Sequence, residues 1–419
     1  MTTANAPART ATASPDSTRN DPVAVVTIAG GHFVHDAFAS FLSPLLPLLI
    51  AKLGLTLTLA GSLSALQSLP SIINPVLGMI GDRISLRWLA IIAPTATAIA
   101  MSLIGIAPTY TVLAILLVVA GISSASWHTP TPVLVARSTG RRVGLGMSVL
   151  MMGGELARTL GPLIAVGAVS LWGLEGIWRL IPLGVGASVI LYWRTRKLEA
   201  PHTARRGGAW AQTWVELRRV LLPIAGIILT RSFVGVALST YLPTLLTREG
   251  DSLLQAGGAL SVLMLAGAIG SLLTGTVSDR LGRKRVLSAV LILSPLFMFL
   301  FLNVRGWIVL PVLFLLGFMS NSTSPVLLAL VQENGRDHPA TANGAYMALE
   351  FVGGSLITII VGALADALGL RTAFGICGVV ALFAVSFVFL LPRPGGREGG
   401  SRSTGSRPQP AAASVGGSA

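Results

Sequence analysis

The chain alternates between long apolar runs and short breaks that hold charged, glycine and turn-forming residues. Most runs have about 20 residues or more, the length that a helix needs to cross the hydrocarbon core of a bilayer. A span in lipid must satisfy its own backbone hydrogen bonds, so helices are the expected form. The pattern predicts twelve membrane-spanning helices, at residues 23–50, 58–80, 87–106, 110–136, 144–170, 175–193, 221–247, 252–277, 286–303, 307–331, 341–366 and 371–391.

The composition supports an all-α integral membrane protein. Of the 419 residues, 53% are hydrophobic and only 11% are charged, and the mean hydropathy is +0.76. A soluble domain usually has about a quarter charged residues, so this chain has too few to cover a surface that faces water. The net charge of +14 does not indicate a nucleic-acid partner, because the basic residues lie in short loops between spans rather than on one face of a soluble domain.

The distribution of Lys and Arg predicts the orientation of the chain. If the N-terminus is inside, the inner breaks hold most of the 30 Lys and Arg residues, and positive residues are known to favour the cytoplasmic side. The outer breaks then hold only Lys52, Arg179, Arg248, Arg305 and Arg371. We therefore expect a multi-pass protein of the cell membrane with both termini in the cytoplasm.

The longest break between spans divides the chain into two sets of six helices. It covers residues 194–220, is basic, and is interpreted as a cytoplasmic linker that anchors to anionic lipid or, alternatively, carries a regulatory site. The predicted bundles are residues 23–193 and 221–392. The flanking segments 1–22 and 393–419 are poor in apolar residues and are expected to be disordered cytoplasmic tails.

Several kinds of chemistry are not indicated. Cys377 is the single cysteine, which excludes disulfides and cysteine-based metal sites within one chain. No ATP-binding Gly-x-x-x-x-Gly-Lys-Ser/Thr stretch occurs, and no nucleophile–base spacing suggests an enzyme. We expect no metal or cofactor, a proton gradient as the energy source, and a monomer whose partners are a small-molecule substrate and the bilayer.

Two of the inner breaks repeat a motif. Gly78, Asp82 and Arg83 recur as Gly275, Asp279 and Arg280 at a constant offset, and the second copy continues with Gly282, Arg283 and Arg285, whereas the first keeps only Arg87. Duplicated six-helix halves are typical of secondary transporters. We expect Gly275 to let two helices pack closely, Asp279 to accept from a helix N-terminus, and the arginines to latch the halves together. The alternative is that these are ordinary basic cytoplasmic loops, which would explain the arginines but not their spacing with Gly and Asp.

The second copy resembles the loop motif of the major facilitator superfamily. That resemblance covers nearly all of residues 23–392 and implies two pseudo-symmetric six-helix bundles around a central cavity, with the motif as a gating loop. The stretches "GHFVHD", "GISSASWHTP" and "GLGMSVLMMGGELARTLGPL" resemble the fosmidomycin-resistance group of drug efflux proteins. His32, Asp36 and His128 match that group, whereas Thr129 interrupts the pattern and Glu155 is an unexpected acid.

Five ionisable residues lie well inside predicted spans, namely Asp36, Glu155, Arg158, Arg231 and Glu350. Each would cost about 2.5–3.5 kcal/mol against lipid, so they must face a wet cavity or one another. The resemblance implies that helices one, four, seven and ten line the cavity and that Asp36, His128 and Arg231 reach it.

Roles for the polar residues follow from their chemistry. Asp36 and His32 lie one turn apart on one face, and we predict that they take part in proton coupling with His128 and Glu155, because histidine changes charge near neutral pH. A purely structural cluster is the alternative. The predicted substrate-binding residues are Arg158, Arg231, Trp127, Glu350 and Asn321, with the two arginines suited to hold an anionic group. Glu155 and Arg158 could instead neutralise each other.

The sequence therefore predicts a proton-coupled secondary transporter that works by alternating access. Gly161-Pro162 in the fifth span resembles an element of antiporters, which favours export of a drug-like or anionic small molecule by antiport. A proton symporter that imports a sugar or an organic acid is the alternative, and a non-transporting sensor with the same fold stays open.

Overall fold

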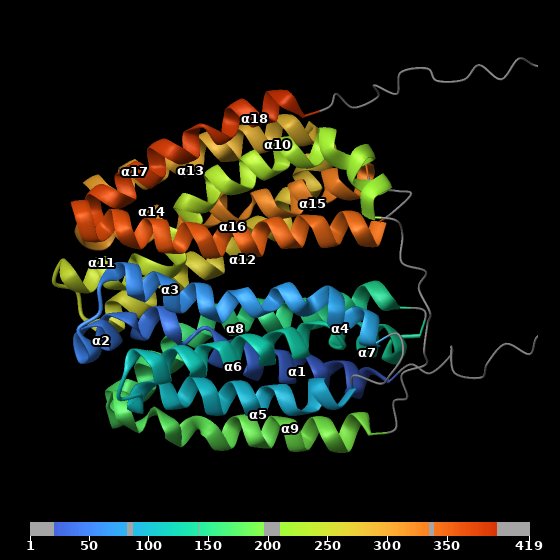
Figure 1. The fold of residues 1–419 in the computed structure, drawn as a ribbon, viewed down its shortest axis with the longest axis vertical. Coiled ribbons are helices and arrows are strands. Elements are labelled where there is room, and N and C mark those ends of the chain that lie inside the picture. Colours follow the sequence, from blue (N-terminus) through green and yellow to red (C-terminus); the bar gives the residue numbers. More distant parts are fainter. Residues whose placement is uncertain (1–20, 82–86, 141, 197–209, 335–338, 392–419) are drawn as a thin grey trace, which may run out of the picture.

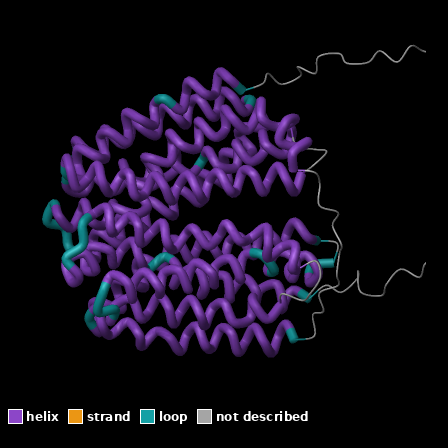
Figure 2. Tube along the Cα trace, in the orientation of Figure 1, coloured by secondary structure: helices purple, strands orange, loops and turns teal. Residues whose placement is uncertain are grey.

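The structure is a computed structural model that describes residues 21–81, 87–140, 142–196, 210–334 and 339–391. These residues are almost entirely helical, and the helices form two bundles that lie side by side (Figures 1 and 2). The N-terminal half contains α1 to α9, and the C-terminal half contains α10 to α18. The all-α fold with twelve spans in two related halves, which the sequence predicted, is confirmed. The boundaries drawn for tails and linker stay predictions.

Each of the first six predicted spans corresponds to a helical stretch of the N-terminal half. The first two are α1 (Pro22–Ala39) with α2 (Leu42–Leu53), and α3 (Leu57–Ser68) with a 3₁₀ turn (Leu69–Ile73) and α4 (Asn74–Gly81). The others are α5 (Arg87–Leu103), α6 (Tyr110–His128) with α7 (Thr131–Ser138), α8 (Val143–Trp172), and a 3₁₀ turn (Leu174–Leu180) with α9 (Ile181–Thr195).

The C-terminal half repeats this arrangement. Its spans are α10 (Trp210–Val236) with a π-helical turn (Ala237–Tyr241) and α11 (Leu242–Arg248), α12 (Leu253–Leu281), α13 (Arg283–Asn303), α14 (Val309–Asn321) with α15 (Thr323–Asn334), α16 (Pro339–Leu368), and α17 (Leu370–Leu382) with α18 (Ala384–Leu390). Within the described ranges, 11 helical stretches are long and apolar enough to cross a membrane, and the second span is a shorter apolar helix over Leu57–Ile73.

Proline explains two of the breaks within spans. Pro70 starts the 3₁₀ turn that separates α3 from α4, and Pro130 separates α6 from α7. Proline has no backbone N–H and its ring displaces the carbonyl four residues earlier, so the helix loses a backbone hydrogen bond there. The spans bend at these points, and the second break places the end of α6 beside the middle of the protein.

Gly121 of α6 and Gly317 of α14, which lie in the fourth and tenth spans, make similar contacts in the two halves. A Cβ on Gly121 of α6 would lie 2.3 Å from the Gln67 carbonyl oxygen, and one on Gly317 of α14 would lie 2.3 Å from the Leu263 carbonyl oxygen. In both places only glycine allows the backbones to come this close. The internal repeat read from the sequence is therefore also a repeat of helix packing.

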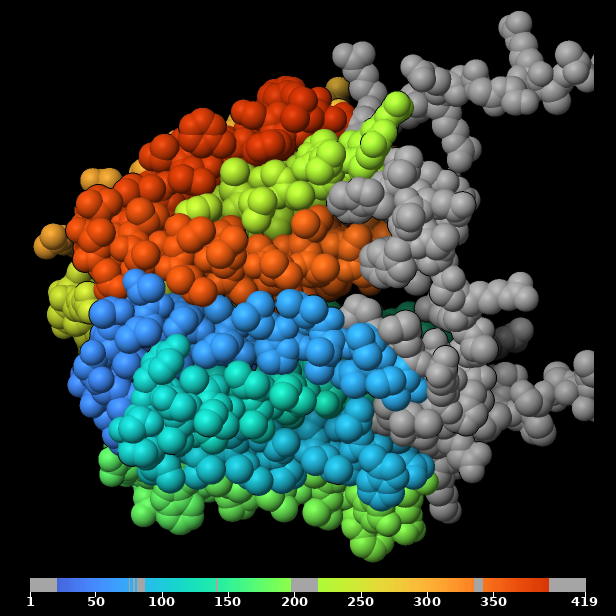
Figure 3. Space-filling model, in the orientation of Figure 1, coloured from blue at the N-terminus to red at the C-terminus, as the bar shows by residue number. Residues whose placement is uncertain are grey.

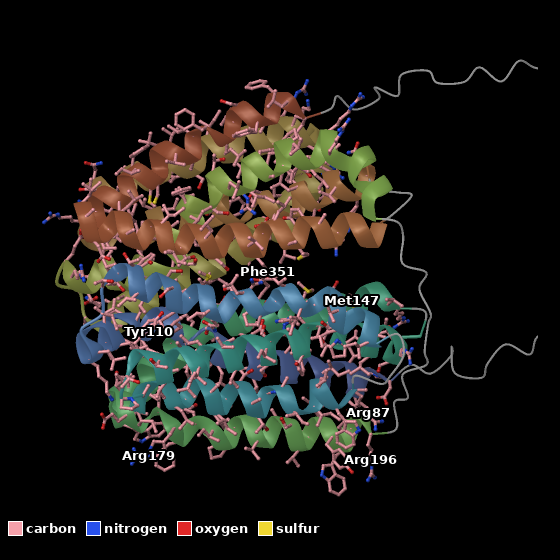
Figure 4. The ribbon with its side chains drawn as sticks, in the orientation of Figure 1. Arg87, Tyr110, Met147, Arg179, Arg196 and Phe351 are labelled. Carbon is pink, nitrogen blue, oxygen red and sulfur yellow. The ribbon has the colours of Figure 1, made fainter. Side chains whose placement is uncertain are left out.

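The repeated loop motif behaves differently from what we expected. In the first copy, Gly78 lies in α4, whereas Asp82 and Arg83 fall outside the described residues. Arg87 begins α5 and its Nη1 donates to the Arg196 carbonyl oxygen at 2.6 Å, so it joins two helices of one half (Figure 4).

In the second copy, a Cβ on Gly275 would meet no atom within 4 Å, so the close helix packing expected there is absent. Arg283 contacts Asp279 at 2.9 Å and Glu333 of α15 at 2.6 Å, all within the C-terminal half. Asp279 thus pairs with Arg283, which follows Gly282 (φ +93°) at the start of α13. Arg280 and Arg285 are exposed. The expected latch between halves is not seen in these described contacts, because Arg283 is held by its own half.

The two ends of the molecule differ. At one end, which we call the tail end, α1 begins and α18 ends (Figure 1). At the opposite end, which we call the closed end, α2 and α3 contact the π-helical turn, α11 and α16 of the other half. Figure 3 shows the halves in contact along α3 and α16, with a hollow between them nearer the tail end.

Candidate functional site

A cavity of about 790 Å³ lies between the two halves. Its walls come from α1, α2, α3, α6 and α8 on one side. On the other side they come from α10, the π-helical turn, α12, α14, α15 and α16. Phe351, labelled in Figure 4 at the boundary between the halves, is one of the lining residues. A cavity with walls from both halves can change its access when the halves move, which is the geometry that alternating access needs.

The carboxylate of Asp36 lies at the centre of a histidine cluster on the cavity wall. Its Oδ2 is 3.2 Å from His32 Nε2, and its Oδ1 is 3.4 Å from His128 Nε2 and 3.9 Å from His35 Nε2. Asp36 and His128 line the cavity. The His32 ring, one turn before Asp36 on α1, is buried behind them.

The hydrogen bond at His32 Nδ1 bears on the contact between His32 Nε2 and Asp36. His32 Nδ1 is 2.7 Å from the Leu150 carbonyl oxygen of α8. A carbonyl can only accept, so Nδ1 carries a hydrogen. At the 3.2 Å contact between His32 Nε2 and Asp36 Oδ2, two bare acceptors would repel each other, so a proton on either atom would favour the contact. This contact is attractive only when that proton is present.

A second chain of hydrogen bonds orients His35. Ser123 Oγ donates to the Ala93 carbonyl oxygen at 2.9 Å, and Thr97 Oγ1 donates to Ser123 Oγ at 2.8 Å. With the Thr97 hydrogen used in this way, His35 Nδ1 must donate to Thr97 Oγ1, 3.0 Å away. The fully buried His35 ring thus turns its Nε2 side toward Asp36. His35 is adjacent to Asp36 in α1, so helix period alone does not place it in this cluster, and its contact with Thr97 of α5 fixes it there.

Trp127 supports the cluster from behind. Its ring stacks on His35 with the ring centroids 5.4 Å apart, and its side chain is fully buried. It does not line the cavity, so the substrate contact predicted for Trp127 has no geometric support here. The bulk of the indole instead packs between α1 and α9, where its neighbours include Leu191.

A second charged group on the N-terminal side is an ion pair between Glu155 and Arg158 of α8. Both side chains line the cavity, and that of Arg158 is 52% exposed. The pairing that their spacing allowed is present. Because Arg158 is half exposed, its guanidinium can still donate to a molecule inside the cavity.

The C-terminal side carries a third charged group. Arg231 of α10 forms an ion pair with Glu350 of α16 and contacts Ser324 Oγ at 3.3 Å. Tyr346 donates its hydroxyl to Glu350 at 2.7 Å. Glu350 and Tyr346 line the cavity, whereas Arg231 is not among the lining residues, so the pairing of two arginines across the cavity is not seen.

Two further observations complete the site. Asn321, at the end of α14, lines the cavity, where a residue predicted to bind substrate should lie. Its backbone carbonyl oxygen accepts from Ser271 Oγ. Sequence reasoning missed Tyr346, although a tyrosine four residues before a mid-span acid is a usable signal because both lie on one helix face.

The histidine cluster also has the donor set of a metal site. The ligating atoms of His32, Asp36 and His128 all lie within 4.8 Å of one another, and imidazole with carboxylate suits zinc. The His32 bond to Leu150 is the kind that orients a metal-bound imidazole. The sequence predicted no metal, and that stays a prediction for these three residues.

Comparisons with known proteins place this geometry among transporters. The family model described as Major Facilitator Superfamily matches residues 28–358. The chain is 25% identical over 372 residues to the fosmidomycin resistance protein of Escherichia coli (strain K12), covering 87% of this chain and 91% of that protein. It is 25% identical over 374 residues to the multidrug resistance protein MdtG of Yersinia enterocolitica, covering 84% and 89%.

A solved structure shares the fold. A bacterial homolog of the human lysosomal transporter Spinster, in an inward-facing and unoccupied conformation, superposes with a TM-score of 0.72 and 13% identity, covering 90% of this chain and 97% of that one. At this level of identity the likeness concerns the arrangement of helices and not the substrate.

Proposed function

We propose, for a chain that belongs to the Major Facilitator Superfamily of membrane transporters, that it is a proton-coupled antiporter which exports a drug-like or anionic small molecule. As a member of that family it is a multi-pass secondary transporter and not an enzyme. The observations that carry the proposal are the contacts of Asp36 with His32 at 3.2 Å and with His128 at 3.4 Å beside the cavity. We propose that His32 and Asp36 share one proton at this contact. We further propose that the tail end is cytoplasmic, as the positive-inside rule favours.

Proton movement and substrate movement would be coupled because Asp36 can bind either a proton or a substrate. When the shared proton leaves, the carboxylate of Asp36 and the lone pair of His32 face each other, and a hydrogen-bond donor on a substrate can relieve that repulsion. Proton and substrate would then exclude each other at one site, which is the condition for exchange. The names of the E. coli and Y. enterocolitica relatives, which concern resistance to drugs, support export.

Symport of an organic acid is the second candidate, and Arg158 is the observation that favours it. An anion that binds the half-exposed guanidinium must compete with Glu155. Protonation of Glu155 would release Arg158, so proton and anion would strengthen each other's binding. Such positive linkage would carry the proton and the anion across the membrane in the same direction. The sign of the linkage therefore separates antiport from symport.

The proposal is tested in proteoliposomes with an imposed pH gradient and a pH-sensitive dye inside. A panel of neutral, cationic and anionic compounds, including fosmidomycin, is chosen first by thermal stabilisation of the purified protein. For antiport, adding a substrate outside should drive protons out of the vesicles as the substrate enters. Protons that enter with the substrate would instead establish symport. Substrate movement that never changes internal pH, at any gradient, would reject proton coupling altogether.

The Arg158 guanidinium should decide preference for anions. We expect Arg158→Ala to weaken transport of anionic substrates by about tenfold or more, since a hydrogen bond to a charged group contributes about 1.5–3 kcal/mol, and to leave neutral substrates nearly unchanged. Initial rates over a range of concentrations measure this. Arg194→Ala, at an exposed position near the end of α9, is the control for lost positive charge. Equal losses for anionic and neutral substrates would reject the anion contact.

A further inference from the structure

The closed end is held by a carboxylate of one half on a helix N-terminus of the other. Asp366, near the end of α16, accepts from the Leu57 backbone N–H at 2.7 Å through Oδ1. Its Oδ2 accepts from the Thr58 backbone N–H at 2.8 Å and from the Thr58 hydroxyl at 2.6 Å. The first N–H groups of a helix have no partner within it, and a negative charge there is favourable.

Two more contacts join the halves at the same place. Tyr241 donates its hydroxyl toward the Thr358 carbonyl oxygen at 2.8 Å and lies 3.1 Å from the Leu57 carbonyl oxygen, so it touches both halves. Ser43 of α2 donates to the Ser239 carbonyl oxygen at 2.5 Å. Ser239 and Tyr241 belong to the π-helical turn, a local interruption of the helix that occurs frequently at functional sites.

Glycines allow α3 and α16 to come close enough for these bonds. A Cβ on Gly61 of α3 would lie 2.5 Å from the Thr358 carbonyl oxygen, and one on Gly362 of α16 would lie 2.4 Å from the Leu57 carbonyl oxygen. Both would also clash with the Tyr241 hydroxyl. Each half therefore contributes one glycine to the contact, and no side chain separates the two backbones.

We infer that Asp366, Tyr241 and Ser43 form a gate that keeps this end of the transport path shut while the cavity is open elsewhere. Asp366 acts as a positioning residue: it holds the first turn of α3 through three hydrogen bonds that must all break when the halves separate. The Leu57 and Thr58 N–H groups can then turn to water. The inference needs only alternating access, a property of the family, and does not depend on the substrate or the coupling ion.

The gate is tested by measuring the width of the closed end directly. Spin labels are placed at Leu171→Cys and Trp307→Cys, two exposed positions at this end in opposite halves; the natural Cys377 is buried. Pulsed electron resonance on the full chain in nanodiscs, without substrate, should give mainly one short distance. We expect Asp366→Ala to raise the ratio of open to closed populations by about tenfold or more, as loss of charge-assisted hydrogen bonds implies. Asp366→Asn, Tyr241→Phe and Ser43→Ala should act in the same direction, less strongly.

Two ion pairs at the same end provide matched controls, because each lies within one half. Lys52 contacts Glu175 in the N-terminal half at 2.8 Å, and Arg371 pairs with Glu249 in the C-terminal half. Glu175→Gln and Glu249→Gln should leave the distance distribution unchanged. An unchanged distribution in folded Asp366→Ala would overturn the gate, and so would an equal shift in the two controls. If Asp366→Ala does not fold, Asp366→Asn and Tyr241→Phe decide by the same criterion. Because no substrate or pH gradient is used, failure here is distinguishable from failure of proton coupling.

Discussion

Replacing Asp36 with Asn should reduce transport driven by a pH gradient to the level of empty vesicles. Asn cannot exchange a proton, and its amide N–H₂ can donate to His32 Nε2 in place of the proton that we propose His32 and Asp36 share. The local geometry is thus preserved while the exchangeable proton is lost. The measurement is initial uptake into proteoliposomes with and without an imposed gradient.

The same variant should separate coupling from translocation. Exchange of labelled for unlabelled substrate at equal pH needs no net proton movement, so we expect Asp36→Asn to retain a large part of it. Asp251→Asn, which removes an exposed carboxylate outside the cavity, is the control and should behave as wild type in both assays. Gradient-driven accumulation at the wild-type level in Asp36→Asn would remove Asp36 from the coupling site.

Replacing Arg231 with Ala should destabilise the protein strongly, by about 3–5 kcal/mol, as expected when one partner of a buried ion pair is removed. The side chains of Arg231 and Glu350 are only 14% and 23% exposed. Without the guanidinium, Glu350 would keep the Tyr346 hydroxyl as its described donor, and its charge would lose its described ion-pair partner. The loss should appear as a lower melting temperature in detergent and as reduced yield of monodisperse protein.

A charge-free pair of similar volume tests the reason for this loss. Arg231→Met combined with Glu350→Leu removes both charges, and we expect the melting temperature to recover most of the way toward wild type. Arg158→Ala is the comparison on the other half, since Arg158 is 52% exposed and an exposed pair contributes at most about 1 kcal/mol. If the double variant is no more stable than Arg231→Ala, unpaired charge is not the cause of the loss.

The helical spans were predictable because each apolar stretch in lipid must form its own backbone hydrogen bonds, which is a local requirement. The predicted spans agree with the helical stretches to within a few residues, except at the start of the seventh, where α10 already begins at Trp210. The pairing of His32 with Asp36 was equally accessible, because residues four apart share a helix face.

Other contacts could not be read from the chain. His35 joins the Asp36 cluster because α5 supplies Thr97 behind it, and Trp127 turns into the protein instead of the cavity. Gly275 was expected to pack against a neighbouring helix but faces open space. At each of these residues the environment depends on a neighbouring helix. A sequence motif does not specify which helix packs against it.

By itself, the sequence determined the number of spans, their division into two related halves, and which ionisable residues lie deep in the membrane, because all of these follow from local hydropathy and helix period. Only the tertiary structure decided that Arg231 pairs with Glu350, 119 residues away, and that Asp366 caps a helix that begins 309 residues earlier. Such contacts depend on how the two halves pack against each other. That packing is a property of the whole chain, and no local period in the sequence encodes it.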